Sequence, residues 1–447
     1  MDPLPPDHLD LPPDQIEERF RWARTRGHPT YLWPDIPLHL WRSALDAIEG
    51  VTRRLLEPGA AAVALEVPRD VVPEAVGVAA FTSGMGPLLG WHVERGTLEA
   101  EPPVARLLAL HLLHGRRRAD KVRATLLEAT GTLAQAGIDV VGIKGIHTSY
   151  ALFPEPGTRP LSDIDLVIPP RRFDDADLAL RRAGHSPGPS SRRPLKRGYR
   201  PPGTPNVLRS LSLTHAEGPI QLDLHANLDR NFFGVRTLRF GFPAAGERAP
   251  WPVPGGAGDR PLPDVLAEPL LSAFLAAHAS EGLHNLTLVR LVELVLSLRL
   301  GLAQGTLRWD DLLSRLEAVR ATRFVHPAFE LVERLAPGTL DPDFRAALAE
   351  QATPRMERVL AGMRPATAQR MEGLSLDERL MWAQGPVETL RRLVDMVWPS
   401  SAGNAPGERS RIYLERLFRL LRGRVTLRSA EEPPRRSERR PANGPAA

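Results

Sequence analysis

The sequence predicts an α+β protein in which a small mixed β-sheet core lies between an N-terminal and a C-terminal helical region. Apolar residues recur at helical spacing over residues 15–137 and again over residues 262–335 and 376–422. Between these regions, short runs rich in β-branched residues occur at residues 138–143 and 161–168, and the second run alternates strictly. At 447 residues the chain is longer than one hydrophobic core usually serves, so we expect several subdomains.

Composition narrows the classes of protein to which the chain can belong. Hydrophobic residues make up 42% of the sequence, which is typical of a globular protein. The chain has no cysteine, which excludes disulfides, thiolate nucleophiles and cysteine-ligated metals. Its first residues do not form a secretory signal, and charged residues interrupt the most apolar stretch, residues 286–303. We therefore expect a cytoplasmic protein with no membrane partner.

The net charge of +5 raises the question of a nucleic-acid partner. Arginines are spread along the whole chain, and the only lysines are Lys121, Lys144 and Lys196. This dispersion is more typical of the base composition of a genome, which favours arginine codons, than of a basic surface that follows phosphates. We favour a solvated surface, and a nucleic-acid partner is not excluded.

The same patterns predict the limits of the parts. Both ends, residues 1–14 and 424–447, are rich in proline or charge without periodicity and are expected to be disordered tails. We assign residues 15–137 to the N-terminal helical region, 138–260 to the α/β core and 261–423 to the C-terminal helical region.

Within the core, each further segment follows from its own pattern. A short helix is expected at residues 146–153, and a second at 173–183 because its apolar residues are spaced three and four apart. Residues 186–204 are rich in Pro, Gly, Ser and Arg and predict a long mobile loop. Two more strands are predicted at residues 207–214 and 220–226.

The strand at residues 161–168 carries two acids on one face. Successive side chains of a strand point to opposite faces, so Asp163 and Asp165 project together while Ile164 and Leu166 project toward the core. Two carboxylates this close repel one another, and something positive must lie near them if both are ionised. A divalent cation is the economical answer, and oxygen ligands favour Mg²⁺ or Mn²⁺.

The strand at residues 220–226 repeats this arrangement. Leu222 and Leu224 face the core, while Asp223 and His225 share the other face. If the two strands are neighbours, Asp223 joins the acidic pair as a third metal ligand. Three carboxylates can hold two metal ions, an arrangement suited to phosphoryl transfer.

Other polar residues near the acids are candidates for binding phosphate. Lys144 and Gly145 follow a strand and open a short helix, where an ammonium group and backbone N–H groups can meet phosphate oxygens. Arg159 could add a bidentate contact, or could pair with a nearby acid such as Glu155 and orient the loop.

Two further residues beside the acids have open roles. Ser162 is a candidate for the nucleotide site or a plain strand hydroxyl. His225 is either a structural histidine or a residue that binds ligand.

Three motifs together resemble the family of uncharacterised nucleotidyltransferases in the polymerase-β-like superfamily. They are Val-Gly-Ile-Lys-Gly at residues 141–145, Arg-Pro-Leu-Ser-Asp-Ile-Asp-Leu-Val at 159–167 and Leu-Asp-Leu-His at 222–225. The resemblance implies Asp163 and Asp165 as metal ligands, Asp223 as the third carboxylate, and Lys144 with Gly145 in the nucleotide loop. The broader superfamily has Gly-Ser in this loop, so a serine contact to the triphosphate is not carried over.

The expected activity is transfer of a nucleoside monophosphate from a nucleoside triphosphate, such as ATP, to a hydroxyl group. The acceptor could be a small molecule, a protein or an RNA, and the sequence favours none of them. One alternative is a glycosyltransferase that uses nucleotide sugars, since these enzymes also bind metal through Asp-x-Asp. Another is a module of the same fold that binds nucleotide without catalysis.

Overall fold

The computed structural model describes residues 36–59, 62–192, 195–203, 220–252, 262–283, 286–366 and 375–397. They belong to a unit spanning Met1–Leu393, except for the last residues of the final described helix, which fall in a second unit, Val394–Ala447. The predicted strand at residues 207–214 and both predicted tails lie outside the described residues. Within the described part, no helix combines the length and the apolar character that a membrane span requires.

The N-terminal part is helical between residues 38 and 135, as its apolar spacing predicts. Its helices are α2 (Leu38–Leu55), α3 (Pro73–Ser83), α4 (Gly86–Glu94) and α5 (Pro102–Gln135). Proline occupies one of the first positions of α3, α4 and α5, where its missing N–H costs no helical hydrogen bond. The two-residue strands β1 (Val63–Ala64) and β2 (Leu98–Glu99) pair in parallel beside them.

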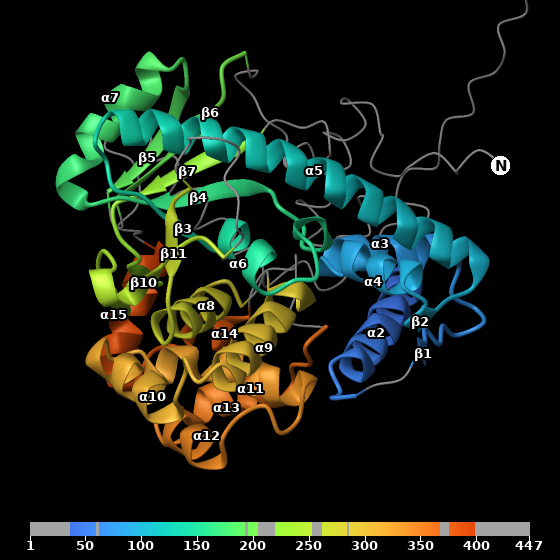
Figure 1. Ribbon diagram of the computed structural model, residues 1–447. Helices are drawn as coiled ribbons and strands as arrows, with labels where there is room; N and C mark the ends of the chain where they lie inside the picture. Colours follow the sequence, from blue (N-terminus) through green and yellow to red (C-terminus); the bar gives the residue numbers. More distant parts are fainter. Residues whose placement is uncertain are drawn as a thin grey trace, which may run out of the picture. The chain divides into compact units, whose positions relative to one another are not determined.

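The long helix α5 connects this helical part to the sheet (Figure 1). Its first half packs against α3 and α4, and its second half buries Val122, Leu126 and Leu133 among the apolar residues of the strands. The close contact with α4 requires glycine, because a Cβ on Gly90 would lie 2.2 Å from the carbonyl oxygen of Leu108.

The central sheet is mixed and has seven strands in the order β10-β11-β3-β4-β7-β6-β5. The strands are β3 (Val141–Ile143), β4 (Asp163–Val167), β5 (Ser186–Arg192), β6 (Leu195–Arg200), β7 (Gln221–His225), β10 (Arg248–Ala249) and β11 (Asp264–Leu266). The inner strands β4 and β7 run parallel, whereas β3 pairs with β4 and β6 pairs with β7 in antiparallel fashion. This sheet with helices around it confirms the predicted α+β fold.

The alternation in β4 and β7 has the predicted consequence. Ile164 and Leu166 of β4, with Leu222 and Leu224 of β7, are fully buried in one apolar cluster under α5 and α7 (Phe173–Arg182). The opposite faces of both strands are thereby left for the polar residues. Short elements complete this part: α6 (Gly145–Ala151), the 3-10 turns η2 (Pro156–Thr158), η3 (Pro170–Arg172) and η5 (Ala245–Glu247), and the hairpin β8 (Arg230–Phe232) with β9 (Arg236–Leu238).

The predicted mobile loop at residues 186–204 is wrong, because most of it forms the antiparallel strands β5 and β6. The composition misleads because β5 is the edge strand of the sheet, where proline removes no essential ladder hydrogen bond. Strand β6 is held by its pairing with β7 and by Tyr199, which is completely buried.

The sheet also extends past residue 260, since β11 pairs in parallel with β3. The helical part that follows comprises α8 (Leu270–Glu281), α9 (Leu288–Ala303), α10 (Trp309–Ala318), α11 (Thr322–Leu335), α12 (Pro342–Ala349), α13 (Pro354–Ala361), α14 (Leu376–Leu380) and α15 (Gly385–Val397). Side-chain caps begin three of these helices, with Asp341, Thr353 and Ser375 accepting hydrogen bonds from backbone N–H groups.

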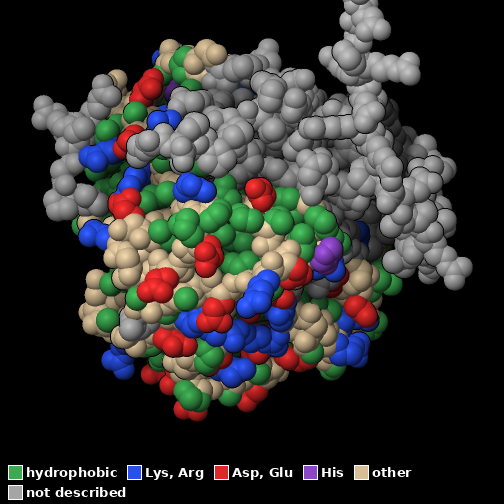
Figure 2. Space-filling view, turned by 90° about the vertical axis from the view of Figure 1, so that its right-hand side faces the viewer, with side chains coloured by type: hydrophobic (Ala, Val, Ile, Leu, Met, Phe, Trp, Pro, Cys, Tyr) green, Lys and Arg blue, Asp and Glu red, His purple; other side chains and the backbone are tan. Residues whose placement is uncertain are grey.

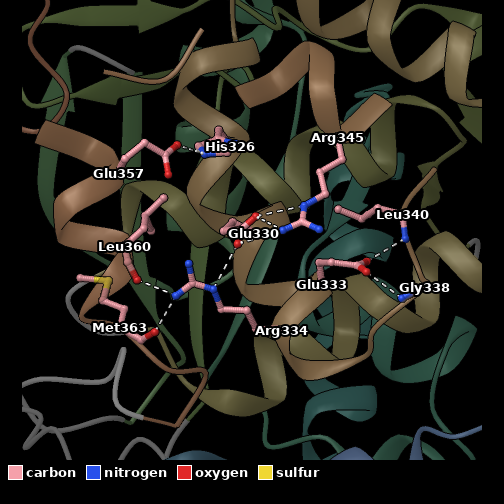
Figure 3. Close-up of polar contacts among 10 residues, drawn as sticks. All are labelled: His326, Glu330, Glu333, Arg334, Gly338, Leu340, Arg345, Glu357, Leu360 and Met363. Atoms are coloured by element: carbon pink, nitrogen blue, oxygen red, sulfur yellow. Dashed lines mark hydrogen bonds and ion pairs between the residues drawn. The ribbon is translucent and has the colours of Figure 1, made fainter. Parts of the chain in front are cut away.

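Helix α11 organises the polar contacts of this helical part (Figure 3). Glu330 accepts hydrogen bonds from Arg334 on its own helix and from Arg345 on α12. His326 of α11 contacts Glu357 of α13 at 2.8 Å between Nε2 and Oε1. The helices are thus tied by paired charges as well as by their apolar faces.

Candidate active site

The acids identified in the sequence meet on adjacent strands. Asp165 of β4 lies directly opposite Asp223 of β7 in the parallel register, and Asp163 precedes Asp165 on the same face. Asp165 and Asp223 are buried, with 3% and 6% of their surface exposed. The structure therefore brings all three predicted carboxylates to one polar face of the sheet.

Two lysines supply the positive charge that this face needs. The ammonium of Lys144 lies 2.5 Å from Oδ1 of Asp165, and that of Lys196 lies 2.5 Å from Oδ2 of Asp223. Lys144 follows β3 and Lys196 is on β6, so the cations flank the two acidic strands. These ion pairs keep the buried carboxylates compensated without a metal ion.

His225 is a third partner of the acids. Its Nε2 lies 2.8 Å from Oδ1 of Asp165, and its ring is buried. Burial lowers the pKa of His225 to about 3, so the imidazole is neutral and its Nε2–H donates to the carboxylate.

The two acids of β4 differ in their electrostatics. Burial alone would raise the pKa of Asp165, but the charge of Lys144 and the hydrogen bond from His225 hold it well below its usual range. Burial and the charge of Asp165 raise the pKa of Asp163, which accepts a hydrogen bond of 2.8 Å from Ser162 Oγ. The pair thus combines a strongly ionised carboxylate with one that binds protons more readily.

The turn that carries Lys144 is conformationally constrained. Lys144 has φ of 56° and ψ of −134°, a region that non-glycine residues rarely occupy. A Cβ on the next residue, Gly145, would lie 2.3 Å from Nη1 of Arg159. In the Lys-Gly sequence, therefore, a lysine with a strained backbone contacts Asp165, and the following glycine leaves space for the guanidinium of Arg159.

Arg159 does not pair with Glu155, which instead binds Arg116. Its Nε and Nη2 contact the two carboxylate oxygens of Glu293 on α9, at 2.8 Å and 3.1 Å. Thr148 of α6 also donates a hydrogen bond to Glu293. Arg159 is consequently a fixed side chain that ties the acidic strand to the C-terminal helices.

Arg118 supports the entry to β4 from the N-terminal side. This buried residue of α5 donates from Nε to the carbonyl of Leu161 and from Nη2 to that of Ser162, both at 2.8 Å. Burial lowers the pKa of Arg118 to about 10, against the opposing charge of Asp163. It orients the backbone immediately before the acids.

A pocket of about 480 Å³ opens beside the acids. Its polar wall contains Asp163 and Asp165, together with the cationic residues Arg118, Lys144, Arg159 and Arg290. The rest of its lining includes the apolar residues Phe81 of α3, Pro87 of α4 and Val289 of α9, and the histidines His111 and His114 of α5. This volume and mixed lining suit a ligand of nucleotide size.

The sequence patterns identified the acids but not Lys196, Arg118, Glu293 or Arg290. Lys196 carried one usable signal, because it is one of only three lysines in the chain. The other three residues lie on long helices, where charged residues are ordinary. Only the packing of α5 and α9 against the core distinguishes them.

The donor set fits a divalent cation. One ligand atom from each of Asp165, Asp223 and His225 lies within 4.8 Å of the others, and all three residues are buried. Asp163 lies on the same face of β4. Carboxylate oxygens suit Mg²⁺ and Mn²⁺, and the His225 ring holds Asp165 in place through its hydrogen bond.

Comparison with known proteins gives one match, to a protein family. A family described as "Uncharacterised nucleotidyltransferase" matches residues 73–337, more than half of the chain. This span runs from the start of α3 to just past the end of α11, and it includes every residue of the pocket. No curated protein and no solved structure gives a significant match. The chain belongs to the uncharacterised nucleotidyltransferase family.

Proposed function

We propose that the protein is a metal-dependent nucleotidyltransferase that moves a nucleoside monophosphate from a nucleoside triphosphate to a hydroxyl group. The observation that carries this proposal is the acidic face of β4 and β7, where Asp165 and Asp223 are register partners and Asp163 lines a nucleotide-sized pocket. Cationic side chains line the same pocket, and their positive charge complements the negative charge of a triphosphate.

In this proposal Asp163, Asp165 and Asp223 hold Mg²⁺ or Mn²⁺. A divalent cation there would neutralise phosphoryl oxygens and favour ionisation of the attacking hydroxyl. Asp223 either holds a second ion or accepts the proton of the acceptor hydroxyl. Ser162 fixes the orientation of Asp163 through its 2.8 Å hydrogen bond, and His225 does the same for Asp165.

The phosphate contacts come from the residues around the Lys-Gly turn. Lys144 lines the pocket and its ammonium contacts Asp165, so in this proposal the ammonium can reach a phosphate oxygen with little movement. Gly145 has no side chain that would collide with the Arg159 guanidinium at the edge of the pocket. The Glu293 carboxylate holds the Arg159 guanidinium in place, which makes this contact to the donor preorganised.

The acceptor is a hydroxyl of a small molecule, a protein or an RNA. Figure 2 shows Lys and Arg side chains beside Asp and Glu on the face that it presents, without an extended area of one sign among the described residues. This face gives no reason to prefer a nucleic acid over the other acceptors. Because nucleoside triphosphates and Mg²⁺ are abundant in the cytoplasm, we propose that the protein acts there.

Calorimetric titration with ATP, GTP, CTP and UTP, each with Mg²⁺, Mn²⁺ or EDTA, tests the proposal. We expect one or more triphosphates to bind only with metal, and the Asp163→Asn/Asp165→Asn variant to lose this binding. A matched control is Asp174→Asn/Asp175→Asn, which removes two exposed acids from the first turn of α7. Equal binding by the wild type and the Asp163/Asp165 variant would contradict the proposal.

Turnover distinguishes the remaining alternatives. Release of pyrophosphate in the presence of candidate acceptors would establish transfer. The Lys144 and Lys196 ion pairs, which compensate the acids without metal, are the one observation that favours a module that binds nucleotide without catalysis. Metal-dependent binding without pyrophosphate release would support that module, and competition by nucleotide sugars alone would support a glycosyltransferase.

A further inference from the structure

Arg290 differs from the other cations of the pocket. Lys144 pairs with Asp165, Arg159 pairs with Glu293, and Arg118 binds backbone carbonyls. Across the described ranges of the chain, the Arg290 guanidinium makes no hydrogen bond and no ion pair. It lines the pocket from the first turn of α9.

The surroundings of Arg290 do not compensate its charge. Burial and the neighbouring charge of Arg159 lower its pKa, and this effect outweighs the opposing charges of Glu293 and Asp163. A guanidinium nevertheless stays protonated in proteins, so the side chain carries a full charge in a poorly solvated place. Such a charge is costly unless an anion lies beside it.

We propose that Arg290 binds the polyphosphate chain of the nucleoside triphosphate, a role that rests on the proposed function and extends the phosphate site to the C-terminal helices. The planar guanidinium donates two parallel hydrogen bonds to phosphoryl oxygens. Asp163 and Asp165 line the same pocket and would repel a simple anion. A polyphosphate brings its own divalent cation, so it satisfies both the acids and the guanidinium.

Helix α9 holds Arg290 in place for this contact. Glu293 lies three residues further on, on the same side of the helix, and it is fixed by Arg159 and by Thr148. These contacts fix α9 against the loop before β4 and against α6. Arg290 is therefore presented to the pocket by a rigid element, which lowers the entropy cost of binding.

His278 of α8 adds a neutral donor to the same pocket. It lines the pocket, and within the described chain its buried Nδ1 has no hydrogen-bond partner. Burial and the charge of Arg230 hold its pKa well below the usual range, so the ring contributes a hydrogen bond without a charge. His278 therefore adds a hydrogen-bond donor but no positive charge to the pocket, and Arg290 supplies a charge that no other described residue pairs with.

The test measures binding of inorganic tripolyphosphate and of ATP, each with Mg²⁺, to the wild type and to Arg290→Gln, Arg290→Lys and Arg299→Gln. Arg299 is on the same helix but contacts the carbonyl of Leu56 and Thr339 outside the pocket, so Arg299→Gln controls for the loss of one charge from α9. We expect Arg290→Gln to weaken both ligands by about tenfold or more, Arg290→Lys by less, and Arg299→Gln to leave both unchanged.

A second readout separates ligand binding from a structural role. Because the guanidinium lacks a partner in the described chain, Arg290→Gln should leave the melting temperature of the ligand-free protein unchanged or raise it. A lower melting temperature in both Arg290 variants, or undiminished tripolyphosphate binding by folded Arg290→Gln, would overturn the inference. Arg290-dependent binding of tripolyphosphate without metal-dependent ATP binding would instead refute the proposed function and leave the polyphosphate site standing.

Discussion

Lys196 reaches Asp223 from the neighbouring strand β6, and the register makes this contact specific. Gly198 lies opposite Asp223 in the antiparallel pair, and a Cβ there would come within 3.1 Å of Oδ1 of Asp223. Gly198 of β6 therefore leaves room for the Asp223 carboxylate, and Lys196, two residues before it on the same strand, supplies the positive charge. Although burial opposes it, the charges of Asp223 and Asp165 raise the pKa of Lys196.

We predict that Lys196→Met lowers the free energy of unfolding by about 1–3 kcal/mol, because it leaves the buried Asp223 carboxylate without its counter-charge. Manganese should then stabilise this variant more than it stabilises the wild type, since the metal replaces the missing ammonium group. Thermal unfolding with and without Mn²⁺ measures both effects.

Lys121→Met is the control for Lys196→Met, because Lys121 lies on α5 and does not line the pocket. It should not show the larger response to manganese. An equal manganese response in Lys196→Met and the wild type would argue against the acidic face as the metal site.

Glu268 gives a prediction about pH. Its carboxylate accepts hydrogen bonds from the hydroxyls of Ser272 and Ser297, both at 2.8 Å, yet burial raises its pKa above the ordinary value of 4.5. A carboxyl whose pKa is higher in the folded state stabilises the fold below pH 4.5, and this contribution is lost as the pH rises through the folded pKa.

Glu268→Gln should therefore lose less stability than the wild type when the pH is raised from about 4.5 toward neutrality, because the amide has no charge to bury. Urea unfolding at several pH values measures this difference. Glu317→Gln on the exposed side of α10 is the control and should follow the wild-type curve. Parallel curves for Glu268→Gln and the wild type would contradict the prediction.

At the residue scale, sequence patterns find groups that lie on one strand and miss groups that converge from separate elements. The alternation rule placed Asp163 with Asp165 on one face. The repulsion between them predicted a metal ion, but the structure supplies Lys144 and Lys196, so metal binding remains a prediction. No local pattern could show that Lys196 pairs with a carboxylate on a strand beyond it.

At the scale of elements, glycines determine how closely α5 packs. A Cβ on Gly115 would lie 2.1 Å from the carbonyl oxygen of Gly157 in η2, whereas a Cβ on Gly131 of the same helix would meet nothing within 4 Å. Both glycines cost helix stability, but only Gly115 is required by a neighbour.

We predict that Gly115→Ala destabilises the protein by about 1–3 kcal/mol through forced separation of α5 and η2. Gly131→Ala should stabilise it by about 0.5–1 kcal/mol, because alanine favours the helix. Chemical denaturation of the two variants measures these opposite signs. A destabilised Gly131→Ala, or an unaffected Gly115→Ala, would show that the packing of α5 is looser than described.

The periodicity of elements with a buried face was sufficient to predict them. Strands β4 and β7 and helices α5 and α7 all lie within the predicted segments, and α6 begins one residue before its predicted start, because each presents an apolar face to a core. The predicted loop at 186–204 failed because pairing with β7, and not side-chain composition, holds β6. Hydrogen bonding to a partner strand leaves little trace in the sequence of either strand.

At the scale of the whole chain, the sheet depends on segments outside the predicted core of residues 138–260. Strand β11 lies at residues 264–266 and pairs with β3, while α5 ends at residue 135 and covers one face of the sheet. A fragment of residues 138–260 should therefore not fold, whereas residues 36–393 should fold. Circular dichroism and cooperative thermal unfolding test this, and a cooperatively folded short fragment would contradict it.

The strand order also bears on whether the protein needs a metal ion to fold. Along the sheet from β3 to β6, the site residues run cation, acid, acid, cation, from Lys144 through Asp165 and Asp223 to Lys196. In zinc fingers, folding and metal binding form a single equilibrium, so the apoprotein is unfolded. Here the lysines provide the counter-charge within the chain, and the two equilibria are separate. Chelation of divalent cations should accordingly yield a protein that is inactive but still folded, and that recovers as soon as the metal returns.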